Sequence, residues 1–160
     1  MVALILLRHA TAARPVAGQP DSGRPLTPEG LKEAQGAGAA MSGRSIAPDL
    51  VLCSTALRTR QTLSGALREL RPDPEIRFLP ELFDGGDYQA IVLAHARGAA
   101  TILVVGHNPF IQEATLTLMD GGAEEPERRF PPAAFAVLTS PGSWAGIRAG
   151  RMRLEEFVLP

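Results

Sequence analysis

Two histidines in the sequence follow apolar segments that have the character of buried strands. His9 comes after the uninterrupted run Val2–Leu7 and one arginine, and His107 comes after Thr101–Val105 and one glycine. A short apolar run that ends in polar residues fits a strand buried on both faces, as in a parallel sheet. Open α/β sheets bind their ligands at the carboxyl ends of such strands. We therefore treat both imidazoles as candidates for one ligand site.

Two arginines are expected at the same edge of the sheet. Arg8 directly precedes His9, and Arg58 lies just beyond the apolar segment Leu50–Ser54, which is also expected to be a strand. A guanidinium pairs with phosphate oxygens in bidentate fashion, and a neutral imidazole held at one nitrogen is a competent nucleophile for a phosphoryl group. Phosphoryl transfer is stabilised mainly by fixed positive charge on the equatorial oxygens. Arg8, Arg58 and His107 would supply that charge without a metal.

A metal site is the alternative use of the two histidines. Together with Glu81 or Asp84 they would form a His/His/acid ligand set. Arg8, however, stands next to one of these histidines and would repel a cation. We therefore expect neither a metal nor another cofactor.

The segments between the strands carry helix signals. Thr27-Pro28-Glu29 predicts a helix start, with the threonine as N-cap and an acid in the first turn. Leu31, Ala34, Gly38 and Met41 would share one narrow face of that helix, made of small residues that allow close approach to a sheet. The other helix signals are an N-cap at Ser54 or Thr55, a helix over residues 87–97, and Asn108 as N-cap before Pro109, with Gly121 and Gly122 ending that last helix.

Further strands are expected over residues 76–79, 133–138 and 152–158. Strands that alternate with helices imply a mainly parallel sheet with helices on both faces. We therefore predict a single α/β domain over residues 1–160. The segment Ala12–Leu26 is rich in proline and glycine and is expected to be a loop. A loop of this length inside a compact domain is usually functional or mobile.

Composition narrows the class of partner. The formal net charge of −1 gives no reason to expect nucleic acid or an anionic membrane. The apolar run at the N-terminus is too short for a signal sequence or a membrane span, so we expect a cytoplasmic protein. Cys53 is the only cysteine, which rules out an intramolecular disulfide and a cysteine-based zinc site.

Four segments resemble those of the histidine phosphatase superfamily, in the family's order and spacing. They are Leu7-Arg8-His9-Ala10, with alanine where the family has glycine, then Arg24–Gly30, Ser54–Thr62 and Gly106-His107-Asn108-Pro109. The short chain and these segments are most similar to the SixA-type phosphohistidine phosphatases. The resemblance implies a phosphoglycerate mutase-like fold with an α/β/α arrangement of three layers. It also implies His9 as the phosphorylated nucleophile, with Arg8, Arg58 and His107 holding the phosphate.

The resemblance leaves the general acid and the substrate open. Members that use an acid carry it after the third strand, where Glu81 stands, and Asp84 is a nearby substitute. An alkoxide leaving group needs a proton in the transition state, whereas phosphohistidine can be protonated on its leaving group near neutral pH. The short chain also leaves little room for insertions that enclose small substrates. Both points favour phosphohistidine in a protein or peptide. A small ester such as a sugar or nucleotide phosphate is the alternative, and a phosphate-binding module without turnover is a third hypothesis.

Overall fold

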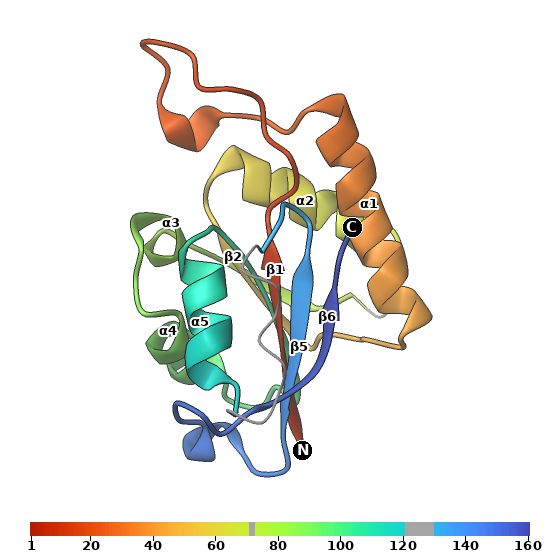
Figure 1. Ribbon diagram of the computed structural model, residues 1–160, viewed down its shortest axis with the longest axis vertical. Coiled ribbons are helices and arrows are strands. Elements are labelled where there is room, and N and C mark those ends of the chain that lie inside the picture. The colour runs from red at the N-terminus through yellow and green to blue at the C-terminus, as the bar shows by residue number, and fades with distance from the viewer. Residues whose placement is uncertain (71–72, 121–129) are drawn as a thin grey trace.

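Strands and helices alternate along most of the chain in the structure, a computed structural model that describes residues 1–70, 73–120 and 130–160 (Figure 1). The strands are β1 Val2–Arg8, β2 Leu50–Ser54, β3 Glu75–Leu79, β4 Thr101–Gly106, β5 Phe135–Ser140 and β6 Arg153–Val158. The α-helices are α1 Pro28–Gly43, α2 Leu57–Leu67, α3 Glu81–Asp84, α4 Tyr88–His95 and α5 Phe110–Leu118. Two short 3-10 turns complete the described elements, η1 Asp21–Gly23 and η2 Trp144–Gly146.

The described strands form one six-stranded sheet in the order β3-β2-β4-β1-β5-β6. Strands β1 to β4 pair in parallel, and β5 runs antiparallel to both of its neighbours. The predicted mainly parallel α/β fold is therefore confirmed. In the register of β1 on β4, Arg8 lies opposite Gly106, so the residues that follow the two strands emerge side by side.

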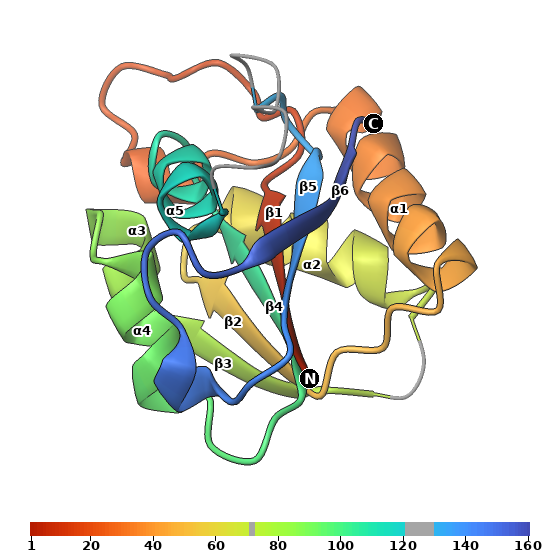
Figure 2. The ribbon, with the colours of Figure 1, turned by 60° about the horizontal axis from the view of Figure 1, so that its bottom comes forward.

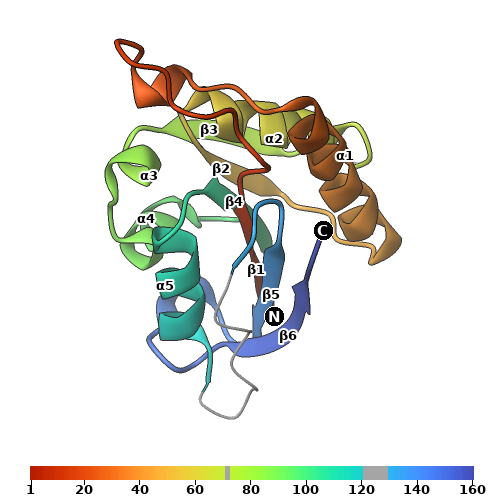
Figure 3. The same cartoon turned by 45° about the horizontal axis from the view of Figure 1, so that its top comes forward.

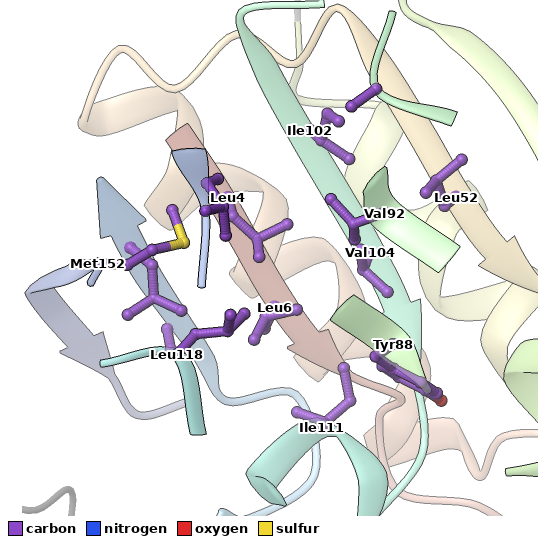
Figure 4. Close-up of a cluster of buried hydrophobic side chains, with 14 of the residues drawn as sticks. Leu4, Leu6, Leu52, Tyr88, Val92, Ile102, Val104, Ile111, Leu118 and Met152 are labelled. Carbon is purple, nitrogen blue, oxygen red and sulfur yellow. The ribbon is translucent and has the colours of Figure 1, made fainter. Parts of the chain in front are cut away.

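Helices cover both faces of the sheet. Successive side chains of β1 point to opposite faces, so each face has its own apolar core. Ile5 and Leu7 join the core under α1 and α2. Leu4 and Leu6 join the core under α3, α4 and α5 (Figure 4). Figures 2 and 3 show α1 and α2 together on one side of the sheet, with α4 and α5 on the other. The predicted three-layer arrangement is thus confirmed.

Small residues bring α1 against α2 rather than against the sheet. A Cβ added to Gly38 would collide with the backbone of Ala66, and one added to Gly65 would lie 2.8 Å from the Cβ of Ala34. The expected face of small residues therefore exists, but its close neighbour is a helix. The expectation for Leu31 is wrong, since its side chain is 49% exposed while Ala34, Gly38 and Met41 are buried.

Two expected helix caps are also wrong. Ala56 is the N-cap residue of α2, without a side-chain cap, because the hydroxyl of Ser54 lies instead within hydrogen-bond distance of a histidine. Pro109 is the N-cap residue of α5, and the Asn108 amide donates to Phe130 O and Gln112 Oε1. The Thr27 cap is confirmed, since its Oγ1 accepts a hydrogen bond from Gly30 N at 3.0 Å.

The other sequence expectations differ from the structure only at their ends. The first strand extends through Arg8, β5 begins and ends two residues later than expected, and the helix expected over residues 87–97 spans 88–95. Gly121, Gly122 and the charged segment 124–129 lie outside the described residues. Helix α5 ends at Leu118, before those glycines.

The loop Ala12–Leu26 runs over the end of the sheet where the parallel strands terminate (Figure 1). It is not entirely irregular, since it contains η1 and a bridge between its first and last residues, Ala12 and Leu26. None of the helices in residues 1–70, 73–120 and 130–160 has the length and apolar character needed to cross a bilayer.

Candidate active site

The two histidines predicted to share a site lie beside each other. His9 follows β1 and His107 follows β4, and the backbone N–H of His9 donates to Gly106 O at 3.0 Å. The centroids of the two imidazole rings are 5.2 Å apart, and both side chains are buried. The parallel register of neighbouring strands is what brings these residues together, although they are far apart in the sequence.

The hydrogen bond of His9 defines which nitrogen carries its proton. Its Nδ1 lies 2.7 Å from the carbonyl oxygen of Ala10, and a carbonyl can only accept, so Nδ1 is the protonated nitrogen. The lone pair is then on Nε2. Burial is the main reason that the pKa of His9 is lowered to about 4. The bond to Ala10 opposes this shift, and the charges of Arg58 and Arg8 contribute to it. The ring is therefore neutral near pH 7.

His107 is also held neutral, by burial and by its neighbours. Burial, followed by the nearby His9 and Arg58, lowers its pKa to about 3. Its Nε2 lies 2.8 Å from Ser54 Oγ. Its backbone N–H donates to the hydroxyl of Tyr88, which itself donates to Leu82 O at 2.7 Å and so ties β4 to α3 and α4.

Gly106 allows this arrangement, because it stands where β4 passes under the ring of Tyr88. A Cβ at this position would lie 2.5 Å from the Tyr88 hydroxyl oxygen, closer than real Cβ contacts. The packing of Tyr88 therefore requires a glycine before the second histidine. Tyr88 is visible at the end of the apolar cluster, next to α5 (Figure 4).

Arg58, in the first turn of α2, is buried and reaches the loop residue Asp21. Its Nη1 donates to Asp21 O at 2.8 Å, and its Nη2 donates to Asp21 Oδ2 at 2.9 Å. The guanidinium also lies 5.7 Å from the ring centroid of Phe83. The rings of Phe83 and His107 are T-shaped to each other, with centroids 5.5 Å apart. Burial lowers the pKa of Arg58, and the bond to Asp21 opposes that shift.

Arg8 is anchored from the other side. Its Nη1 donates to Phe130 O at 2.8 Å, and burial lowers the pKa of its guanidinium. Within the described residues, three buried nitrogens of these side chains have no hydrogen-bond partner: Arg8 Nε, Arg58 Nε and His107 Nδ1. Buried polar nitrogens normally have partners, so a cluster of unpaired ones is the chemistry expected of an oxyanion site.

Glu81 and Asp84 stand at the two ends of the short helix α3, and both side chains are exposed. No hydrogen bond or ion pair joins either carboxylate to another residue in the described parts of the chain. The helix reaches the histidines through Phe83 instead. In the same parts of the chain, no three His, Cys, Asp or Glu side chains come together as a potential metal site.

Sequence reasoning missed several neighbours of the four central residues. Asp21 lies in a loop without periodic pattern, and nothing in the sequence links it to Arg58. The sequence suggests only a helix cap for Ser54. The carbonyl of Phe130, which accepts from Arg8 and Asn108, carries no side-chain signal at all.

Comparison with known proteins gives the family. The model of the histidine phosphatase superfamily (branch 1) matches residues 4–91. An uncharacterized protein of Mycobacterium tuberculosis is 35% identical over 96% of this chain and 99% of its own length. Phosphohistidine phosphatase SixA of Escherichia coli is 31% identical over 85% of this chain and 84% of its own. The structure of the protein histidine phosphatase SixA complexed with tungstate superposes with a TM-score of 0.81 at 28% identity, covering 98% of this chain and 96% of the other.

The family match and the SixA relatives agree with the fold and with the paired histidines at one edge of the sheet. The chain belongs to the histidine phosphatase superfamily (branch 1), on its SixA side, and is a phosphatase of the kind that uses a histidine nucleophile.

Proposed function

We propose that the protein hydrolyses phosphohistidine in a protein or peptide, with His9 as nucleophile and with Arg8, Arg58 and His107 holding the phosphoryl oxygens. The observation that carries the proposal is the tautomer of His9. Its Nδ1–H is bound to Ala10 O, so the Nε2 lone pair is available for attack, next to buried guanidinium nitrogens that have no partner in the described chain.

In the first step, His9 Nε2 attacks phosphorus and forms a new N–P bond, while the bond between phosphorus and the substrate nitrogen breaks. The electron pair of the broken bond stays on that nitrogen, and the imidazole departs neutral because its other ring nitrogen carries the proton. The developing charge lies on the equatorial oxygens, where two guanidiniums and the N–H of a neutral imidazole stabilise it. The bond from Nδ1–H to Ala10 O stabilises the positive charge that develops on the His9 ring.

In the second step, water attacks phosphorus and the N–P bond to His9 breaks, which releases inorganic phosphate and restores the neutral imidazole. No oxidant, metal or nucleotide enters this balance.

Two observations support phosphohistidine over an ester. The relative from Escherichia coli, which covers most of this chain, is a phosphohistidine phosphatase. In addition, both exposed carboxylates of α3 lack a bond that would hold them toward the site. A leaving imidazole that is already protonated on its other ring nitrogen needs such an acid less than an alkoxide does. We propose Glu81 as the proton donor where one is needed, with Asp84 as its substitute.

The nucleophile is tested by trapping the phosphoenzyme. Incubation with a ³²P-labelled phosphohistidine peptide should label the wild type in an acid-labile, base-stable bond, and His9→Ala should not be labelled. Equal labelling of both proteins would contradict the proposal. Arg58→Ala and His107→Ala should each lower kcat by about 10²–10³-fold, because each removes a stabilising donor from the transition state.

The substrate class is tested by comparing turnover of the same peptide with that of sugar and nucleotide phosphates. We expect a higher kcat/KM for the peptide and only a small loss of peptide turnover in Glu81→Gln. Efficient ester hydrolysis that is strongly reduced in Glu81→Gln would favour the small-ester alternative. Asp84→Asn is the matched variant, since it removes the other exposed carboxylate of the same short helix.

A further inference from the structure

Ser54, the last residue of β2, is completely buried beside His107. Its Oγ lies 2.8 Å from His107 Nε2. The only other hydrogen bond of this hydroxyl within residues 1–70, 73–120 and 130–160 joins it to the backbone N–H of Ala56, at 3.4 Å. The residue does not cap α2 in the usual way, so its buried hydroxyl requires another reason.

The direction of the bond to His107 follows from counting donors and acceptors. A serine hydroxyl has one hydrogen to donate, and the N–H of Ala56 can only donate to its oxygen. A buried hydroxyl hydrogen needs an acceptor, and among the described residues the only acceptor bonded to Ser54 Oγ is His107 Nε2. The hydroxyl therefore donates to Nε2, which must carry a lone pair. A neutral imidazole then has its single proton on Nδ1.

We propose that Ser54 is a positioning residue, which fixes His107 in the tautomer protonated on Nδ1 and leaves that N–H free to donate to an oxygen of the transferring phosphoryl group. The second half of this inference rests on the proposed function. The first half does not, because the tautomer is a property of the free protein.

The two histidines differ in what binds their Nδ1 atoms, and this difference explains why the tautomer of His107 matters for phosphoryl transfer. Both rings carry a proton on Nδ1, but in His9 the Ala10 carbonyl occupies that proton and in His107 nothing in the described chain does. His9 thus presents a lone pair to phosphorus, while His107 presents an N–H. In its other tautomer, His107 would offer a lone pair at Nδ1, which repels the oxygens of a phosphoryl group.

The tautomer is measured directly by long-range ¹H–¹⁵N correlation spectra of the histidine side chains in ¹⁵N-labelled, full-length, ligand-free protein. In the wild type, His107 should give a protonated Nδ1 and an unprotonated Nε2. In Ser54→Ala, the two nitrogens should move toward averaged shifts, because neither tautomer is then selected. A wild-type His107 protonated on Nε2, or an unchanged spectrum in Ser54→Ala, would overturn the proposal.

A matched control separates this effect from the loss of any buried hydroxyl. Thr115 is fully buried in α5, and its hydroxyl donates to Ile111 O at 2.8 Å. Thr115→Val should therefore leave the His107 signals as in the wild type. Thermal unfolding of both variants checks that each remains folded at the temperature of the spectra.

Kinetics test the second half. Ser54→Ala should lower kcat about 10- to 100-fold with a smaller change in KM, as for other residues that orient a reacting group. Ser54→Cys keeps a weak donor of similar size and should recover part of the loss, and Thr115→Val should keep the wild-type kcat. A Ser54→Ala variant with mixed tautomers and unchanged kcat would refute the role in turnover. Failure of the wild type to hydrolyse any phosphorylated substrate would instead refute the proposed function, and the spectra would still decide the tautomer.

Discussion

Asp21, in the loop Ala12–Leu26, binds the side chain of Arg58, which we propose holds the phosphate. It accepts from Nη1 through its backbone oxygen and from Nη2 through its carboxylate, which leaves Nε and the remaining N–H groups of the guanidinium for a ligand. The carboxylate also pairs with Arg24 at 2.9 Å. Asp21 therefore orients Arg58 without using all its donors.

This arrangement predicts that Asp21→Asn weakens substrate binding. The side chain of Asp21 is 49% exposed, so the ion pair contributes at most about 1 kcal/mol. Its loss should raise KM up to about 5-fold, with little change in kcat or in the unfolding temperature. Steady-state kinetics with the phosphohistidine peptide measure this.

A lower KM in Asp21→Asn would mean that the carboxylate competes with the phosphate instead of orienting its receptor. Glu156→Gln is the control, because it removes an exposed ion pair with an arginine elsewhere in the molecule. Glu156 lies on β6 and accepts two hydrogen bonds, at 2.6 and 2.7 Å, from Arg44, the residue that follows α1. Neither hydrogen bond of this pair involves His9 or His107. This substitution should leave KM unchanged.

At the residue scale, the histidines that could react are predictable from the sequence, whereas the role of a residue that orients them is not. His9 and His107 follow apolar strands, and strand ends in a parallel sheet are predictable. Ser54 also suits a helix cap, and local pattern cannot tell that use from a bond to a histidine 53 positions away. Only the register of β2 on β4 decides between them.

At the scale of elements, α1 and α2 make the most extensive contact between helices in the described chain, and glycines permit it. A Cβ on Gly38 would meet the backbone of Ala66, whereas one on Gly36 would meet nothing within 4 Å. The two positions lie on the same helix, so they differ in environment and not in helix propensity.

We therefore expect opposite effects of the same substitution. Gly36→Ala should raise the free energy of unfolding by up to about 1 kcal/mol, because alanine favours the helix over glycine. Gly38→Ala should lower it by about 1–3 kcal/mol, since the helices must separate or distort. Urea unfolding followed by circular dichroism measures both. Equal effects of the two substitutions would contradict the close packing of α1 on α2.

Helix α1 also shows why its buried face was only partly predicted. Periodicity placed Leu31 with Ala34, Gly38 and Met41, but the partner is a helix that approaches at the small residues, and Leu31 falls outside that contact. Sequence spacing gives the faces of a helix. It does not give the width of the surface that the neighbour covers.

At the scale of the whole molecule, the alternation of apolar strands and helices predicts the α/β fold. It does not predict the order of the strands in the sheet. Placing β1 beside β4 depends on long-range pairing, and this pairing is what joins His9 to His107. The resemblance to the family supplied that juxtaposition in advance. Local pattern alone gives the strand ends without saying which ends are neighbours.

Burying two histidines in a neutral state has a consequence for stability across pH. In the unfolded chain each imidazole has a pKa of about 6.5. In the folded protein burial lowers the pKa of His9 to about 4 and that of His107 to about 3. Between these values and 6.5, the unfolded chain binds protons that the folded protein does not. Stability is therefore full above about pH 6.5 and decreases as the pH falls toward 4.

The expected slope is up to about 1.4 kcal/mol per pH unit for each of the two histidines, because one proton per group is taken up on unfolding. The decrease attributable to His9 should level off below about pH 4, and that of His107 below about pH 3. His107→Gln removes one of the two groups and should make the stability curve between pH 6 and 4 clearly less steep. Urea unfolding at half-unit steps of pH measures the slopes, which are independent of any constant loss of stability in the variant. A variant with the wild-type slope would show that folding does not lower the pKa of His107.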